Sequence, residues 1–224
     1  MIFPTSNKRK QGSAAIPYTQ CYAKTDENGK PGINVEFHLR YVAEVCRILR
    51  RQLPKILAAL SKPAIPSAST HDIGKVSPGF QLKYFRDALI KQISGLSDKP
   101  SGHFITDHAH ISACALWAHV HENNPFECPT VAQIAAMHHG SVLTQPLPTD
   151  SGELLGGSAW SKERKKLIEK MEAEYGTLSF HVPSLVQRDF ISGMVTISDW
   201  IGSDESFFPA TGLPPDIDTR VFEK

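Results

Sequence analysis

The chain has 224 residues, of which 41% are hydrophobic and 21% charged, and its formal net charge at pH 7 is +1. This length is sufficient for one substantial hydrophobic core, and the composition is ordinary for a soluble globular protein. The near-neutral charge excludes the global basic field of a protein that coats duplex DNA, so any contact with nucleic acid must be local.

Cysteine usage and the N-terminal segment indicate the compartment. The four cysteines form no CxxC pair and no zinc-finger spacing, which favours reduced thiols. The N-terminus, MIFPTSNKRK, lacks the apolar run of a signal peptide, and no stretch approaches the roughly 18 apolar residues of a membrane span. We therefore expect a cytoplasmic protein with no membrane partner.

Turn-forming residues precede the first predicted helix. Residues 1–34 are predicted to form an extended arm with turns, of which DENGKPG is the clearest. From Glu36 onward apolar residues recur at helical spacing, which predicts an amphipathic helix that Pro54 ends or kinks. His38 lies in the first turn of this helix, where it either points into a core site or caps a solvent-exposed edge.

The next segments alternate between loops and short helices. Residues 61–69 contain two prolines and are predicted as a loop, and a short helix carrying residues 71–75 follows. Ser77 followed by proline predicts the N-cap and first residue of a helix over about 78–93. Residues 94–104 are predicted as a loop.

Apolar spacing and capping residues predict four more helices in the C-terminal half. These helices cover about 108–120, 130–138, 161–175 and 184–201. Asp107 is the expected cap of the first, and Gly140 is the expected stop after the second. Residues 141–160 are predicted as a loop that is long enough to be a flap or an insertion.

The charged run KERKK at 162–166 is interpreted as a solvated helix face. In the last helix, an apolar stripe is expected to face the core. It comprises Phe190, Met194, Ile197 and Ile201. No alternation typical of strands is sustained anywhere, so the expected architecture is one all-α domain over residues 1–205, with a tail or linker over 206–224.

Histidines and aspartates form an ordered series centred on the stretch THDIGKVSPGFQ at residues 70–81. Alone, an adjacent histidine and aspartate carry little information. The context is a set of five histidines and two aspartates spread over five predicted helices. The set comprises His38, His71, Asp72, His108, His138, His139 and Asp199.

A carboxylate flanked by histidines can bridge two cations, and Asp72 is the candidate bridge. Two ions about 3.5–4 Å apart would share a hydroxide and neutralise charge on a phosphoryl group. The nitrogen-rich ligand set favours Mn, Fe, Co, Ni or Zn over Mg, and the identity of the metal stays open. Lys75 falls on the same helical face as Asp72 and is either a partner of substrate phosphate or an exposed surface lysine.

The tandem pair His138 and His139 has few packing explanations at a helix stop. Adjacent residues on a helix point about 100° apart, so both can reach one metal only where the last turn loosens, as Gly140 allows. Within HAH at 108–110 the residues alone leave two candidates. The other histidines are interpreted as structural or exposed, and they are His103, His110, His119, His121 and His181.

Taken in order, these motifs resemble a known family over nearly the whole chain. They are AKT at 23–25, HL at 38–39, HDIGKVSPGFQ from His71, H-A-x-x-S-A from His108, HHG from His138 and SDWIGSDESFFP from Ser198. The series resembles the HD-superfamily metal-dependent phosphohydrolases. Within this superfamily it resembles the HD nuclease domain of the CRISPR-associated helicase-nuclease of type I systems.

The resemblance implies an HD-domain helical bundle over residues 1–205 with a dinuclear metal site. One divalent transition-metal ion would be held by His38, His71, Asp72 and Asp199. The other would be held by Asp72, His108, His138 and His139. Asp72 and Lys75 would be the catalytic residues, and the family pattern selects His108 rather than His110.

The activity implied is metal-dependent cleavage of single-stranded DNA in CRISPR interference. The implied partners are a helicase and an RNA-guided surveillance complex that opens the target. The chain contains no GxxxxGK[ST] phosphate loop, so we expect the helicase to be either a separate subunit or a part from which this domain was excised. Residues 206–224 would suit a linker toward it.

Two other functions compete with this hypothesis. The same metal core would serve a phosphohydrolase of nucleotides or cyclic nucleotides, and pocket shape discriminates between the two. A metal-free binding module fits poorly, because no proposed ligand position is substituted. Single-stranded DNA needs basic and aromatic side chains near the metals, and the sequence offers Lys83, Tyr84, Arg86 and Trp200 without selecting among them.

Overall fold

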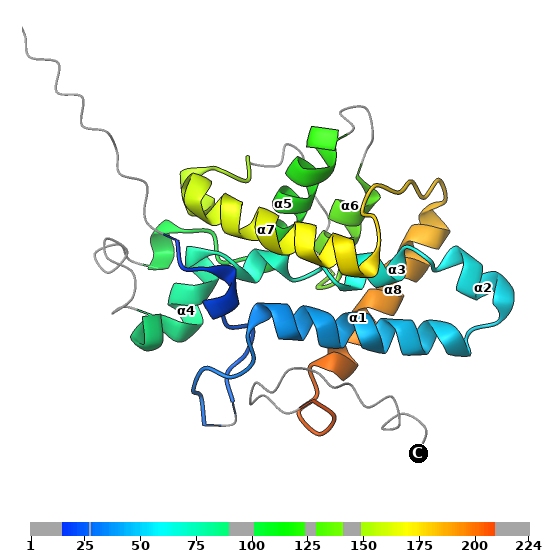
Figure 1. Cartoon of the computed structure of the whole chain (residues 1–224), viewed down its shortest axis with the longest axis horizontal. Coiled ribbons are helices and arrows are strands. Elements are labelled where there is room, and N and C mark those ends of the chain that lie inside the picture. The colour runs from blue at the N-terminus through cyan, green and yellow to red at the C-terminus, as the bar shows by residue number, and fades with distance from the viewer. Residues whose placement is uncertain (1–14, 27, 90–100, 124–128, 141–148, 209–224) are drawn as a thin grey trace, which may run out of the picture.

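The computed structural model describes residues 15–26, 28–89, 101–123, 129–140 and 149–208, and in these residues the protein is helical (Figure 1). The α-helices are α1 (Val35–Gln52), α2 (Lys55–Leu60), α3 (Ala64–Ala68), α4 (Pro78–Leu89), α5 (His108–Asn123), α6 (Thr130–Met137), α7 (Gly157–Tyr175) and α8 (Leu185–Gly202). The 3₁₀ helices are η1 (Tyr18–Gln20), η2 (Ile73–Lys75), η3 (Ser101–His103) and η4 (Glu153–Leu155). Only isolated β-bridges, and no strand, occur in these ranges.

Two helical layers enclose the segment that carries the central motif. Helices α1 and α8 pack against each other and against the short α3. Helix α5 packs against α6 and α7, and α6 also contacts α8 (Figure 1). The short η2 contacts α1, α4, α5 and α7, so the motif lies where both layers meet.

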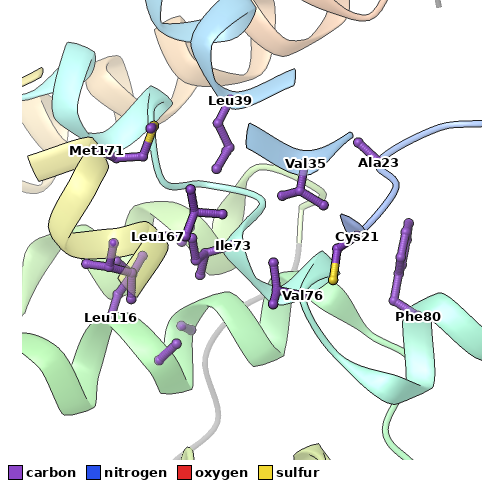
Figure 2. Close-up of a cluster of buried hydrophobic side chains, with 14 of the residues drawn as sticks. Cys21, Ala23, Val35, Leu39, Ile73, Val76, Phe80, Leu116, Leu167 and Met171 are labelled. Carbon is purple, nitrogen blue, oxygen red and sulfur yellow. The ribbon is translucent and has the colours of Figure 1, made fainter. Parts of the chain in front are cut away.

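Apolar side chains anchor the central segment in the hydrophobic core. Ile73 and Val76 are fully buried, and Figure 2 shows them among Leu39 of α1, Leu116 of α5 and Leu167 of α7. Each such side chain contributes about 1.5–3 kcal/mol on full burial. The polar residues that precede them are therefore held by packing on three helices.

Several predicted helix ends are confirmed. Helix α1 stops at Gln52, two residues before Pro54. The Ser77 hydroxyl accepts a hydrogen bond from the backbone N–H of Phe80, and Asp107 Oδ1 accepts one from the backbone N–H of His110. These caps satisfy N–H groups that have no partner within the helix.

The prediction of a loop over residues 61–69 is wrong, because α3 occupies most of it. Pro66 lies in the first turn of this helix, where its missing N–H breaks no intrahelical bond. Ala64 and Ala68 are fully buried against α1 and α8. Tertiary packing of small side chains thus outweighs a loop-like composition.

The predicted loop over 141–160 is too long at its C-terminal end. Residues 141–148 lie outside the described part of the chain, and η4 and the start of α7 occupy most of the rest. Gly156 has a φ of 99°, a left-handed conformation that favours glycine and here starts the helix. Trp160 in the first turn of α7 is fully buried, so this turn is held by the core.

The predicted core face of α8 is correct except at one position. Met194 is buried and Phe190 and Ile201 are partly buried against the core, whereas Ile197 is exposed. The buried face also includes Ile191, Val195 and Ser198. Gly202 lies against Val42 of α1, where an added Cβ would come within 3.2 Å of backbone atoms. Gly202 therefore lets α8 approach α1 closely.

Arg164 contradicts the interpretation of KERKK as a solvated face. Its side chain is fully buried, and its Nε donates to Asp150 Oδ1 over 2.7 Å. Its other nitrogens donate to the carbonyls of Val76, Leu155 and Asp150. One arginine thus ties α7 to the loop before it and to the end of the central motif.

We expect Arg164→Met to destabilise the protein by roughly 3–5 kcal/mol, because it leaves the buried Asp150 carboxylate without its partner. Urea unfolding followed by circular dichroism measures the change. Lys162→Met is the matched control in the same run, and because Lys162 is exposed we expect a change within about 0.5 kcal/mol. Equal effects of the two variants would contradict the assigned role of Arg164.

No helix in the described residues has the length and apolar character needed to cross a membrane. Cys21, Cys46 and Cys114 are buried and form no disulfide. Phe208 is buried, with its ring centroid 4.8 Å from that of Tyr41. The boundary placed at residue 205 stays a prediction, since residues 209–224 lie outside the described part.

Candidate metal centre

The structure brings all seven predicted ligands together from five parts of the chain. His38 lies in the first turn of α1, where Asn34 accepts a hydrogen bond from the backbone N–H of Phe37. The other positions are the turn before η2, the start of α5, the residues just after α6 and the end of α8. They hold His71, Asp72, His108, His138, His139 and Asp199.

The Asp72 carboxylate is the centre of this arrangement and is almost fully buried. Its Oδ2 lies 2.9 Å from His38 Nε2 and 3.4 Å from His71 Nε2. Its Oδ1 lies 3.3 Å from His108 Nε2 and 3.2 Å from His138 Nε2. Each carboxylate oxygen therefore faces its own pair of imidazoles.

Asp199 completes one side of the centre. Its Oδ1 lies 3.4 Å from both His38 Nε2 and His71 Nε2. The Ser203 hydroxyl donates to the same oxygen over 3.1 Å, one turn further along the chain. On the other side, His139 Nε2 lies 2.9 Å from His108 Nε2.

These atoms form two groups that share Asp72, and within each group the ligand atoms lie within 4.8 Å of one another. One group contains His38, His71, Asp72 and Asp199, and the other contains Asp72, His108, His138 and His139. The same two sets were expected from the family resemblance. Their assignment as ligands remains a prediction.

Several donor atoms of the centre have no hydrogen-bond partner and are available to coordinate a cation. His71 Nδ1 is 2.8 Å from the carbonyl oxygen of Ala68, and His138 Nδ1 bonds the carbonyl of Ala135. These bonds place the proton on Nδ1 and leave Nε2 as the coordinating atom. The Nε2 atoms of His71 and His138 and the Oδ1 atom of Asp72 are buried without a hydrogen bond, as cation ligands would be.

The electrostatics of the centre favour ionised carboxylates. Burial acts to raise the pKa of Asp72, but Lys75 and the nearby histidines hold this pKa well below its usual range. Burial likewise acts to raise the pKa of Asp199, but the adjacent imidazoles of His38 and His71 lower this pKa. Two negative charges are thus kept inside the protein and require positive charge nearby.

The histidines divide into two kinds. Burial alone would lower the pKa of His71, but Asp72 and Asp199 raise it to about 10. Burial lowers the pKa of His108 to about 4 and also lowers that of His139. Neutral imidazoles and ionised carboxylates are the protonation states that bind divalent cations, so His108 and His139 fit an ion directly, and an ion bound at His71 would take the place of its proton.

Lys75 is not a free surface lysine. Its Nζ lies 2.6 Å from Asp72 Oδ2, and its side chain is only 11% exposed. Gln81 is fully buried. Its Oε1 accepts a hydrogen bond from the backbone N–H of Tyr22, and its Nε2 donates to the carbonyls of Tyr22 and Lys75. This amide fastens the N-terminal arm to the segment that carries the lysine.

Gly74 permits the close contact between η2 and α5. A Cβ at this position would lie 2.0 Å from the carbonyl oxygen of His108, a distance that no side chain tolerates. The backbone N–H of Gly74 donates to Ser112 Oγ over 2.9 Å, and Ser112 donates to the carbonyl of His108. The missing side chain therefore sets the distance between Asp72 and His108.

We expect Gly74→Ala to destabilise the fold by about 1–3 kcal/mol or more, because the extra methyl group pushes η2 away from α5. It should also lower the amount of bound metal. Urea unfolding and elemental analysis after dialysis measure both effects. Gly193→Ala on α8 is the control, since its Cβ would meet nothing within 4 Å and alanine favours a helix by about 0.5–1 kcal/mol.

The structure separates the two histidines of HAH. His108 lies at the start of α5 with its ring centroid 5.2 Å from that of Phe80, and it faces Asp72. His110 is only partly buried and belongs to neither group of ligand atoms. Two residues along a helix are about 200° apart, so only one can face the centre.

We expect His108→Ala to weaken metal binding by at least about tenfold, because it removes a donor from the group around Asp72 Oδ1. His110→Ala should stay within about twofold of the unmodified protein. Isothermal titration with Mn²⁺ into metal-stripped protein gives both values. Equal losses would show that His108 was wrongly chosen.

A pocket of about 490 Å³ opens onto the centre. Its lining includes Lys75, His108, His139 and Asp199 from the centre, together with Tyr84 on α4. The volume lies in the range of small-molecule sites. The two groups of ligand atoms are therefore reachable by a phosphate ester.

Sequence reasoning missed the roles of four supporting residues. Ser112, Ser203 and Gln81 belong to the quoted motifs, so their positions were visible but their bonds to other parts of the site were not. Lys24, from the AKT motif, bonds the carbonyl of Ser203 and thereby braces the end of α8.

Comparisons with known proteins agree with this geometry. The family model described as "Cas3, HD domain" matches residues 22–208. A comparison with curated proteins gave no match. A crystal structure of T. fusca Cas3-AMPPNP is 21% identical with a TM-score of 0.63, and the alignment covers 87% of this chain and 24% of that chain.

A second solved structure is the Thermus thermophilus Cas3 HD domain, crystallised in the presence of Ni²⁺. It is 19% identical with a TM-score of 0.55, and the alignment covers 91% of this chain and 84% of that chain. At these identities the two structures establish the fold. The present chain spans about a quarter of the T. fusca Cas3 chain.

The fold and the two His/Asp groups define an all-helical HD-type domain with a candidate dinuclear metal centre. The chain belongs to the Cas3 HD-domain family, because the family model matches most of its length. Members of this family are CRISPR-associated, metal-dependent phosphohydrolase or nuclease domains.

Proposed function

We propose that this domain is a metal-dependent nuclease that cleaves single-stranded DNA by two-metal hydrolysis of phosphodiester bonds. It would act in CRISPR interference, with a helicase that supplies the strand and an RNA-guided surveillance complex that opens the target. The observation that carries the proposal is the division of the Asp72 carboxylate between two groups of imidazoles beside an accessible pocket.

The residues that would hold the ions are those of the two groups. His38, His71 and Asp199 would share one ion with Asp72, and His108, His138 and His139 would share the other. The chemistry that such a pair supplies when bound is activation of water and neutralisation of charge on a phosphoryl group. The nitrogen-rich set favours Mn, Fe, Co, Ni or Zn, with Mg less suited.

The chain contributes orientation and charge. Asp72 is held by buried imidazoles on both sides, so its two oxygens keep fixed directions. Lys75 lines the pocket beside Asp72 and is the cation best placed to receive a phosphate oxygen. The bonds from Gln81 and Ser203 hold Lys75 and Asp199 at the rim.

One observation favours a second candidate, a phosphohydrolase of nucleotides or cyclic nucleotides. The pocket of about 490 Å³ has room for a nucleotide but not for a long strand. A DNA strand would have to continue over the surface beyond it. Cleavage assays on the two substrate classes decide between the candidates.

The experiment is cleavage of single-stranded circular DNA by metal-stripped protein resupplied in turn with Mn, Ni, Co, Fe, Zn or Mg. A circular substrate reports internal cuts and is resistant to contaminating exonucleases. We expect at least one transition metal to restore cutting, and Asp72→Ala to reduce it to below a few per cent with its helical circular dichroism retained. Loss of the shared carboxylate affects both ion sites at once.

A chelator provides the negative control for every metal. Substantial cutting by Asp72→Ala with metal bound would contradict the bridging role. Two bound ions without cutting of DNA, combined with hydrolysis of small phosphodiesters, would favour the nucleotide phosphohydrolase.

A further inference from the structure

The structure separates the four side chains that the sequence offered as contacts for single-stranded DNA. Of these, only Tyr84 is among the described residues that line the pocket at the metal centre. Trp200 is 69% exposed on α8 but lies outside this lining, as do Lys83 and Arg86. A base bound beside the centre would therefore meet Tyr84.

The Tyr84 ring is fixed in place by packing against two buried phenylalanines. Its ring centroid lies 4.8 Å from that of Phe80 and 6.3 Å from that of Phe85, and both phenylalanines are buried. Phe80 in turn contacts His108 of the centre. The Tyr84 side chain is 49% exposed, so part of it remains open to a ligand while the rest is fixed by packing.

Lys75 and Tyr84 line the same pocket and are linked through one ring. Lys75 Nζ lies 5.6 Å from the centroid of the Phe80 ring, and this centroid lies 4.8 Å from that of Tyr84. A phosphate can pair with Lys75, and the base of the same nucleotide can stack on an aromatic ring.

Acidic residues at the pocket do not oppose this arrangement. Glu205 is paired with Lys24 over 3.6 Å. Asp26 Oδ1 accepts hydrogen bonds from the backbone N–H groups of Asn28 and Lys30, which lie in the same turn. Both carboxylates are already engaged by positive charge or by N–H donors.

We infer that Tyr84 is a stacking platform for the nucleobase next to the phosphate that enters the metal centre. The inference rests on the proposed action on nucleic acid and adds the subsite that holds the base. Stacking on a single ring accepts every base, because each base has a π-face, so this subsite gives affinity without sequence preference.

The first test measures stacking directly. A short single-stranded oligonucleotide with one 2-aminopurine and cleavage-resistant phosphorothioate linkages is titrated with Zn²⁺-loaded protein, because stacking quenches the fluorescence of this base. We expect quenching by the unmodified protein. Tyr84→Ala should lose most of the quenching and bind about 5- to 150-fold more weakly, whereas Tyr84→Phe should stay within about twofold.

Two controls make the assignment specific. Trp200→Ala removes an exposed aromatic side chain outside the pocket and should leave binding within about twofold. In the second control the 2-aminopurine is replaced with an abasic residue, and binding is followed by fluorescence anisotropy. The unmodified protein should then bind as weakly as Tyr84→Ala binds the intact oligonucleotide. The two changes should not add, because they remove the same contact.

The outcomes distinguish this inference from the proposed function. Absence of quenching, or equal quenching by Tyr84→Ala, overturns the stacking platform even if the protein cuts DNA. Quenching that depends on Tyr84 supports it even if circular DNA stays intact, and then only the nuclease proposal fails. If Trp200→Ala lost as much binding as Tyr84→Ala, the assignment of Tyr84 as the stacking residue would also be overturned.

Discussion

Burial of the Asp72 carboxylate is the constraint on which the arrangement of the site depends. A lone ionised carboxylate inside a protein is strongly unfavourable, and the fold surrounds this one with imidazoles and Lys75. The imidazoles come from α1, from the turn before η2, from α5 and from the end of α6. One charged group therefore requires four segments to meet, and it also defines the candidate metal centre.

The apolar packing beneath the centre supports this requirement. Ile73 and Val76 fix the central segment in the core, and Gly74 between them lets α5 approach. Arg164 then closes the end of the segment by bonding the carbonyl of Val76. One short stretch thus supplies polar residues to the candidate metal centre and apolar residues to the core.

Function at this centre depends on what the pocket admits as well as on the ions. In the proposed function Lys75 would provide charge for a phosphate, and Tyr84, which lines the same pocket, would provide a flat surface. This combination matches a nucleotide unit rather than a bare phosphate. It is common to the nuclease and to the nucleotide phosphohydrolase, so substrate length is what distinguishes these two candidates.

The sequence by itself determined the helical class, most helix ends and the candidate residues of the centre apart from the choice within HAH, because capping residues and the HD motifs are local signals. Only the tertiary structure decided that His108 and not His110 faces Asp72, that Arg164 is buried within a charged run, and that α3 is a helix. It also distinguished Tyr84 from Trp200. These outcomes depend on contacts between segments far apart in the chain, where burial and close packing outweigh local propensity.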